Sequence, residues 1–333
     1  MTSKVYEKKS WKYQNFFFIS KNKTKNYKIT FKNILNLLDI KFKKSDIQLK
    51  VLKKIYKPLY YRKPSIGEID SFLLYFYNYV KSNFITKSGT YSKYLAWEKG
   101  WSYNLKKFKI DPNINSLTPQ FVRKKSLLKI NGEYISPVTK KFEIKLFIIV
   151  KLIIFFKYAL KVKNIYEFGC GTGRNLLLLS RYFKNKTFIG LDYTKSSVKI
   201  LNLISKRKNN ISGHFFDIVN PSSKFLLKKN SLVLTVGSLE QVGLRYKNFF
   251  HYLRNNKPSL VVNFETLNEL YTNNNFSDYL SRQFIVKRNY LRNYLSFLRK
   301  KEKEKIIKII KVKRVFGSQF HEGYSLVVFK FLN

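Results

Sequence analysis

Residues 165–175 read IYEFGCGTGRN, and the residues on both sides of this stretch predict the fold. A short apolar run enters a glycine-rich turn, and the pattern that follows predicts a helix over 174–183. Glycines at such a turn permit positive φ angles and let a ligand approach the backbone closely. A dinucleotide-binding loop needs a glycine where Arg174 stands, and a phosphate-binding loop needs a Gly-Lys-Ser/Thr ending, which is absent. The loop is therefore not suited to a phosphate-rich ligand.

The loop resembles the first motif of the class I S-adenosylmethionine-dependent methyltransferases. That motif, acidic-x-Gly-x-Gly-x-Gly, is matched by Glu167, Gly169, Gly171 and Gly173. The resemblance implies that S-adenosyl-L-methionine is the cofactor. It also implies that the three glycines pass beneath the cofactor and that Glu167 holds the amino group of its methionine part.

Three further features follow in the order that the family has them. Asp192 ends the run FIGLD, where the family places an acid that accepts both ribose hydroxyls, a role that suits the two oxygens of a carboxylate. Asp217 ends GHFFD, where the resemblance implies a contact with the adenine amino group. Gly237 opens GSLEQ, which resembles the Leu-Glu-His run of the class I methyltransferases that act on small molecules but has Gln241 in place of His. A helix cap at Asp192 and a turn residue at Asp217 are the alternatives.

Short apolar runs alternate with helical patterns from residue 164 onward, which predicts an α/β fold with a Rossmann-like, mostly parallel sheet. Two final runs, separated by GSQFHEGY, predict a hairpin, and the resemblance implies that the last strand is antiparallel. The predicted strands cover 165–168, 187–191, 214–216, 232–236, 260–264, 309–316 and 325–331. The predicted helices cover 174–183, 195–208, 240–253 and 277–305.

Three regions are predicted along the chain. Residues 1–60 form a basic, aromatic segment, and residues 61–160 form a mainly helical extension with a substrate cap and a leading helix. Residues 161–333 form the domain that binds the cofactor. Within the extension, Trp97 and Trp101 share one helix face, so they are either core anchors or part of a lid beside Tyr91 and Tyr103.

Three side chains are the candidates for catalysis: Glu240, Glu265 and His321. Two of them follow predicted parallel strands, and His321 lies in the final hairpin. Because open α/β sheets bind ligands at the carboxyl ends of their strands, we expect the three to line one pocket beside the transferred methyl group. The alternatives are a helix cap for Glu240, a lysine partner for Glu265 and a surface position for His321.

The net charge of +47 is the most unusual feature of the composition. Such a charge attracts polyanions, yet only 12 of the 66 basic residues are Arg, and the abundance of Lys, Asn, Ile, Phe and Tyr also fits A/T-rich codons. We therefore expect the charge to reflect base composition more than a polyanion-binding surface.

With the motifs above, we expect a methyltransferase acting on O or N of a small-molecule or glycan acceptor. RNA or other nucleic-acid methylation is the alternative, and a non-catalytic cofactor-binding scaffold is a third.

Few residues are available for metal or disulfide chemistry. Cys170 is the single cysteine and there are three histidines, so neither a disulfide nor a metal site is expected. The most apolar stretch, 142–160, carries Lys145, Lys151 and Lys157, which predicts a helix on the sheet with its lysines at the rim, not a membrane span. The start of the chain has no signal-peptide pattern, so a cytoplasmic location is expected.

Overall fold

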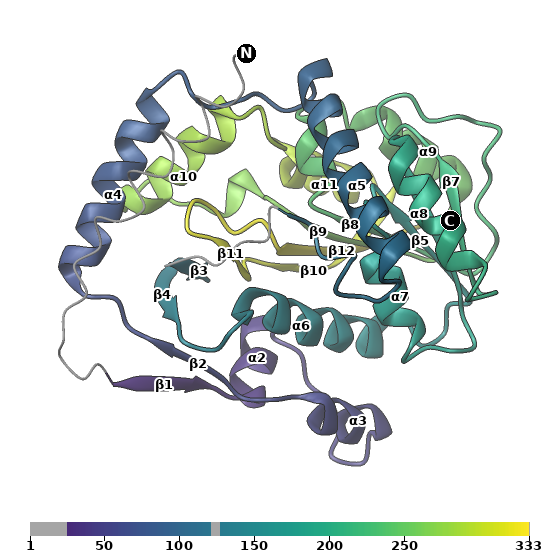
Figure 1. The fold of residues 1–333 in the computed structure, drawn as a ribbon, viewed down its shortest axis with the longest axis horizontal. Coiled ribbons are helices and arrows are strands. Elements are labelled where there is room, and N and C mark those ends of the chain that lie inside the picture. Colours follow the sequence, from purple (N-terminus) through teal and green to yellow (C-terminus); the bar gives the residue numbers. More distant parts are fainter. Residues whose placement is uncertain (1–24, 121–126, 333) are drawn as a thin grey trace.

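A seven-stranded sheet forms the centre of the computed structural model, which describes residues 25–120 and 127–332 (Figure 1). Its strand order is β10-β12-β9-β8-β5-β6-β7. The strands from β5 to β9 are parallel, and β12 is antiparallel to both of its neighbours. The prediction of a mostly parallel sheet with an antiparallel last strand is therefore confirmed. The bounds are β5 Asn164–Phe168, β6 Thr187–Asp192, β7 Ile211–Phe215, β8 Ser231–Val236, β9 Leu260–Glu265, β10 Ile307–Lys313 and β12 Ser325–Phe331.

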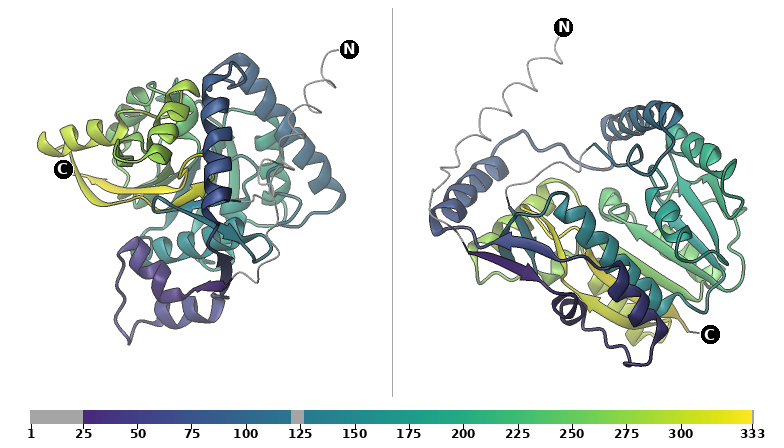
Figure 2. Two further views of the ribbon diagram at one scale, coloured as in Figure 1. Left: turned by 90° about the vertical axis from the view of Figure 1, so that its left-hand side faces the viewer. Right: turned by 60° about the horizontal axis from the view of Figure 1, so that its bottom comes forward.

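Helices cover both faces of this sheet (Figures 1 and 2). Successive strand residues point to opposite faces, so Ile165 packs in one apolar cluster and Tyr166 in the other. The first cluster includes α6 (Phe142–Tyr158), α7 (Arg174–Ser180) and α8 (Lys195–Ser205). The second includes α9 (Lys247–Asn256) and α11 (Tyr294–Lys303). Burial on both faces explains why these strands read as continuous apolar runs.

The helix α6 carries the most apolar stretch of the chain. Lys145 and Lys157 are exposed, as predicted for lysines at the rim. Lys151 is an exception, because its side chain is fully buried beneath the glycine loop's helix and bonds to Asn175. Among the described residues, no helix is both long and apolar enough to cross a membrane.

A second, five-stranded sheet lies beside the first, which the sequence did not predict. Its order is β1-β2-β4-β3-β11, so the short strand β11 from the final hairpin region pairs with the N-terminal extension. Residues 1–24 of the predicted basic segment lie outside the described residues. The bounds are β1 Asn26–Ile29, β2 Leu59–Arg62, β3 Leu128–Ile130, β4 Glu133–Pro137 and β11 Phe316–Ser318. The helices of the extension are α2 Phe31–Leu38, α3 Ile47–Ile55, α4 Ile66–Lys81 and α5 Tyr91–Ile110.

Two helices that were predicted as continuous are broken. The predicted helix 240–253 is a short 3-10 turn, η2 (Leu239–Val242), followed by α9, because Gly243 has a positive φ of 62° between them. The predicted helix 277–305 is α10 (Phe276–Lys287) followed by α11, with Asn289 and Asn293 in the left-handed region between them. Asparagine tolerates that region better than most side chains, so it ends helices.

Candidate active site

The glycine loop lies where the strand order reverses. β5 has β6 on one side and β8 on the other, and open α/β sheets bind ligands at this switch point, beyond the carboxyl ends of the strands. The backbone N–H of Gly169 donates to the carbonyl of Leu191 at 2.7 Å, which ties the loop to β6. Ser238 Oγ donates to the carbonyl of Phe168 at 2.8 Å, which ties β8 to the same loop. A Cβ at Gly169 would collide with Ser238, so this approach requires glycine.

Asp192 braces the glycine loop from the end of β6. Its Oδ2 accepts a hydrogen bond from the Gly171 N–H at 2.8 Å, and its Oδ1 accepts two from Thr194, from the N–H at 2.9 Å and from the hydroxyl at 2.7 Å. Burial raises the pKa of this carboxyl, while these hydrogen bonds lower it. The carboxylate lines the cavity described below, and since Oδ1 already accepts two hydrogen bonds, the acceptor site left for a ligand is on Oδ2.

Glu167 is buried at the end of β5 and belongs to a short polar network. Its Oε1 accepts a hydrogen bond from Asn175 Nδ2 at 2.5 Å, and Asn175 Oδ1 accepts one from the buried ammonium of Lys151. Its other oxygen, Oε2, is buried and has no partner among the described residues. Burial raises the pKa of Glu167 and lowers the pKa of Lys151, and their mutual attraction opposes both shifts.

Asp217 and Gly237 lie on the rim of the same cavity. Asp217 Oδ1 accepts the N–H of Val219 at 2.8 Å, and Oδ2 accepts Asn220 Nδ2 at 2.9 Å, so the carboxylate orders the turn after β7. Gly237 follows β8 with a φ of 61°, and its N–H donates to the carbonyl of Phe264 at 2.9 Å. The cofactor-binding role of both residues stays a prediction.

A cavity of about 800 Å³ extends from the glycine loop to the final hairpin. This volume lies in the upper part of the range of roughly 300–1,000 Å³ that is usual for small-molecule sites. Its lining includes Glu167, Gly169, Gly171, Asp192, Asp217, Gly237, Glu240 and His321, all of them predicted site residues. Gly173 is not in the lining, since it packs against Leu201 and begins α7.

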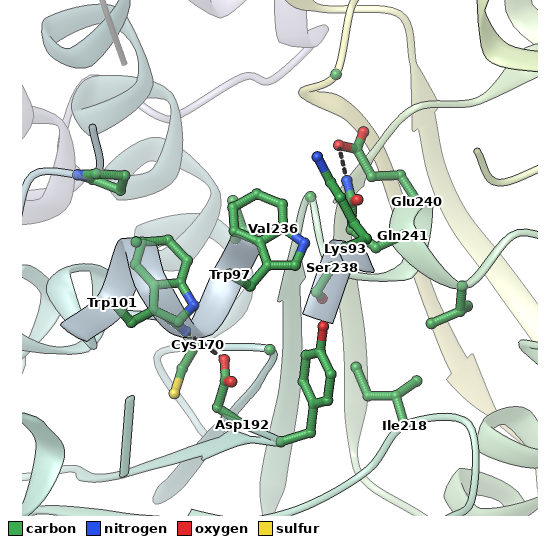
Figure 3. Close-up of a pocket in the computed structure, with 18 of the residues that line it drawn as sticks. Lys93, Trp97, Trp101, Cys170, Asp192, Ile218, Val236, Ser238, Glu240 and Gln241 are labelled. Carbon is green, nitrogen blue, oxygen red and sulfur yellow. Dashed lines mark hydrogen bonds between the residues drawn. The ribbon is translucent and has the colours of Figure 1, made fainter. Parts of the chain in front are cut away.

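The helix α5 covers the cavity and carries both tryptophans. Trp97 and Trp101 stack at 5.4 Å between ring centroids, and Figure 3 shows them above Asp192 and Cys170. A Cβ at Gly171 would lie 2.9 Å from Trp101 Cζ2, so the indole rests directly on the loop. Tyr91 also lines the cavity, whereas Tyr103 does not. The lid interpretation therefore agrees with the positions of Trp97, Trp101 and Tyr91.

Glu98 attaches this lid to the rest of the fold, and no sequence signal indicated it. Its carboxylate accepts hydrogen bonds from the N–H of Ser196 at 3.1 Å and from the hydroxyl at 2.5 Å. Ser196 lies in the first turn of α8, where N–H groups lack helical partners and attract negative charge. Because the two residues are 98 positions apart, only the tertiary structure brings them together.

Glu240 and His321 lie side by side at the cavity wall, although they come from different elements. Glu240 Oε2 lies 3.8 Å from His321 Nε2. The Glu240 oxygens also accept hydrogen bonds from Gln241 Nε2 at 2.9 Å and Thr266 Oγ1 at 2.7 Å. His321 Nδ1 lies 3.3 Å from Ser318 Oγ, and its ring packs against those of Phe284 and Tyr290, with centroids 5.5 Å away in each case.

Glu265 is not where the sequence predicted it. Its side chain is fully buried below the cavity and is absent from the lining, so the prediction that it lines the pocket with Glu240 and His321 is wrong. Its oxygens accept the backbone N–H groups of Ser238, Leu239 and Glu240 at 3.1, 3.1 and 2.9 Å. Burial, followed by the nearby Glu240 carboxylate, raises the pKa of Glu265 to about 8. Glu265 therefore positions the turn that presents Glu240.

Comparison with known proteins returns no matching family and no matching curated protein. Solved structures with a similar fold include the CurJ carbon methyltransferase, at 14% identity and a TM-score of 0.40 over 56% of this chain and 54% of that one. Another is the magnesium protoporphyrin IX methyltransferase from Synechocystis PCC 6803 with bound SAH, at 10% identity and a TM-score of 0.43 over 58% of this chain and 87% of that one. A third, an O-methyltransferase from neocarzinostatin biosynthesis, has 11% identity and a TM-score of 0.37 over 51% and 49%.

The chain spans about half the length of the first two structures that it matches. These similarities are distant, so the fold is assigned from the strand topology and the glycine loop of this structure. The mostly parallel sheet with its antiparallel last strand, together with a glycine loop at the switch point, gives the chain the class I methyltransferase fold.

Proposed function

We propose that the protein is an S-adenosyl-L-methionine-dependent methyltransferase that acts on O or N of a small-molecule acceptor. The observation that supports the proposal most directly is a pair of buried polar atoms beside the glycine loop that lack hydrogen-bond partners. Glu167 Oε2 and Arg174 Nε are both buried without a partner among the described residues, and both side chains line the cavity. A carboxylate and a guanidinium of this kind match the ammonium and carboxylate of an α-amino acid, which the methionine part of the cofactor carries.

The rest of the cofactor fits the remaining predicted residues. Asp192 offers the remaining acceptor site of Oδ2 to a ribose hydroxyl at the tip of β6, and Asp217 lies just beyond β7, one strand further. Trp101 packs directly on Gly171, and a Cβ at this position would collide with the indole. When bound, the cofactor supplies a methyl group activated by a positively charged sulfur. The neighbour from neocarzinostatin biosynthesis was solved with S-adenosylmethionine, which agrees with this cofactor.

The chain's own contribution to methyl transfer is positioning and removal of a proton. Bound S-adenosyl-L-methionine would supply its methyl group to the acceptor's O or N, and its sulfur would keep the electron pair of the broken carbon–sulfur bond. The acceptor's proton passes to the pair of His321 and Glu240, which lie 3.8 Å apart. Glu265 holds Glu240 in place through the backbone N–H groups of the turn.

Calorimetric titration with S-adenosyl-L-methionine tests the proposal. We expect binding by the wild type and a clear loss in Glu167→Gln, because the ammonium loses its charged partner. Glu133→Gln, at an exposed position on β4, is the matched control and keeps wild-type affinity. Absence of cofactor binding by a folded wild type would refute the proposal.

Transfer of labelled methyl groups into a small-molecule extract then tests catalysis. His321→Ala is expected to lower the transfer rate at saturating cofactor while cofactor affinity stays nearly unchanged. If affinity falls and the rate does not, His321 is a binding residue and Glu240 becomes the base.

The net charge of +47 favours nucleic acid as a second class of acceptor. Methyl transfer to RNA, accompanied by RNA binding that weakens steeply with salt, would support that acceptor over a small molecule.

A further inference from the structure

One wall of the cavity has a strong excess of positive charge. This wall, which we call the acceptor wall, consists of the lining residues from segments 89–94, 240–245, 288–290 and 317–324. Its charged side chains are Lys93, Arg245, Arg288 and Glu240, so three cations face one carboxylate. Figure 3 shows Lys93 beside Glu240 and Gln241, on the side of the cavity away from Asp192.

Lys93 and Arg288 retain hydrogen-bond donors that nothing in the described part of the chain uses. Lys93 Nζ lies 5.2 Å from the centre of the Trp97 ring and makes no side-chain hydrogen bond or ion pair with a described residue. Arg288 donates from Nε to Tyr290 Oη at 2.9 Å, and its guanidinium stacks 5.3 Å from the Tyr290 ring. Its terminal nitrogens donate to no described residue, so a planar fork of donors is left for a ligand.

Glu240 does not neutralise the two cations. Its oxygens accept hydrogen bonds from Gln241 and Thr266, and no ion pair joins it to Lys93 or Arg288 among the described residues. Burial, and then the positive charge of Arg288, lower the pKa of Lys93 to about 8, although Glu240 opposes the shift. An anion between the two cations would remove their repulsion and satisfy their donors.

We propose that the acceptor carries an anionic group, a carboxylate or a phosphate, which Lys93 and Arg288 hold at the acceptor wall. This inference rests on the proposed function, because it concerns the second substrate of the same site. Held there, the acceptor extends its nucleophilic atom toward Glu240 and His321. Tyr91, Trp97 and Tyr290 line the same cavity and offer ring surfaces to an apolar or aromatic body.

Three probes of one shape test the inference: 1-naphthoate, 1-naphthyl phosphate and the uncharged 1-naphthamide. Each is titrated calorimetrically into protein saturated with S-adenosylhomocysteine. We expect at least one anionic probe to bind at least about tenfold more tightly than the amide, since charge-assisted hydrogen bonds are worth roughly 1.5–3 kcal/mol. The tighter of the two anions indicates whether the natural group is a carboxylate or a phosphate.

Single substitutions then locate the preference. Lys93→Met and Arg288→Met should each reduce it severalfold, while Lys109→Met, on an exposed part of the same helix α5, should leave it intact. If Arg288→Met does not fold, as judged by circular dichroism, Lys93→Met alone decides.

The outcomes separate this inference from the proposed function. Equal binding of all three probes by protein that binds S-adenosylhomocysteine overturns the anionic acceptor and leaves the methyltransferase proposal standing. The inference is also overturned if Lys109→Met reduces the preference for the anionic probe as much as Lys93→Met does, because the preference would then reflect the overall charge of the protein. If S-adenosylhomocysteine does not bind, the proposed function fails. The three probes are then titrated into the free protein, and the ratio of anionic-probe affinity to amide affinity again tests the anion site.

Discussion

The Glu98 carboxylate on α5 binds both the N–H and the hydroxyl of Ser196, at 3.1 and 2.5 Å, in the first turn of α8. This contact fixes the lid helix to the helix that follows β6, the strand that carries Asp192. Trp101, one turn further along α5, rests on Gly171. The Glu98 carboxylate and the packing of Trp101 therefore both hold the lid over the glycine loop.

Glu98→Ala should loosen this lid. We expect faster amide hydrogen exchange across 91–110 and a cofactor affinity lowered severalfold, since contacts of this kind at a helix N-terminus contribute roughly 0.5–2 kcal/mol. Hydrogen exchange with mass spectrometry measures the first effect and calorimetry the second. Glu133→Ala, a matched loss of an exposed carboxylate, should change neither. Unchanged exchange in Glu98→Ala would show that the packing of Trp97 and Trp101 is sufficient to hold α5.

Asp192→Asn should weaken cofactor binding roughly 10- to 150-fold, which corresponds to the 1.5–3 kcal/mol of a charge-assisted contact. The structure adds a complication, because the same carboxylate also accepts the Gly171 N–H. Thr194→Val is a control for local disturbance, since it removes one donor to Asp192 and leaves the carboxylate, its charge and its contact with Gly171 in place. Calorimetry that gives wild-type affinity for a folded Asp192→Asn would reject the ribose assignment.

The local patterns of the C-terminal half were sufficient to predict its fold. Buried parallel strands read as apolar runs, and the spacing from Glu167 to Asp192 follows the strand–loop–helix–strand unit, so both signals lie close together in the sequence. The second sheet was missed because β11 pairs with β3, nearly 190 residues earlier, and short strands of three residues have no clear period. Lys151 was placed at the rim because its charge suggested solvent, whereas its partner Asn175 lies on α7 and Glu167, which Asn175 contacts in turn, lies on β5.

Glu265 illustrates the limit of topological reasoning. Its position at the end of β9 correctly indicated the active-site edge of the sheet, but a strand's last side chain can point inward as well as outward. Glu265 accepts hydrogen bonds from three backbone N–H groups, and these belong to a turn whose conformation the sequence did not reveal.

Glu265→Ala should destabilise the fold by about 3 kcal/mol, because each buried N–H left without an acceptor costs roughly 1–3 kcal/mol and water enters part of the space. Denaturant titration monitored by circular dichroism measures the loss of unfolding free energy. Glu133→Ala, at an exposed position on β4, is the comparison and should cost much less. A loss below about 0.5 kcal/mol for Glu265→Ala would mean that the carboxylate does not hold the turn after β8.

The affinity for an anionic probe should depend on pH through Lys93. Its pKa in the free cavity is about 8, lowered first by burial and then by Arg288, and Glu240 is the carboxylate that faces it. Only the protonated amine attracts an anion, and the bound anion raises the pKa of that amine. The binding constant of 1-naphthoate should therefore be constant below about pH 7, fall as the pH rises through 8, and level off above the pKa of the bound state. Between pH 7 and 9.5 we expect a decrease of about tenfold.

Two variants test the origin of this decrease. Lys93→Arg keeps its charge over the whole range, so its affinity should stay high and nearly flat, whereas Lys93→Met should bind weakly at every pH. The amide probe should show no dependence on pH in any of the three proteins. A wild type whose affinity for 1-naphthoate falls with pH to the same extent as that of Lys93→Arg would assign the titration to a group other than Lys93.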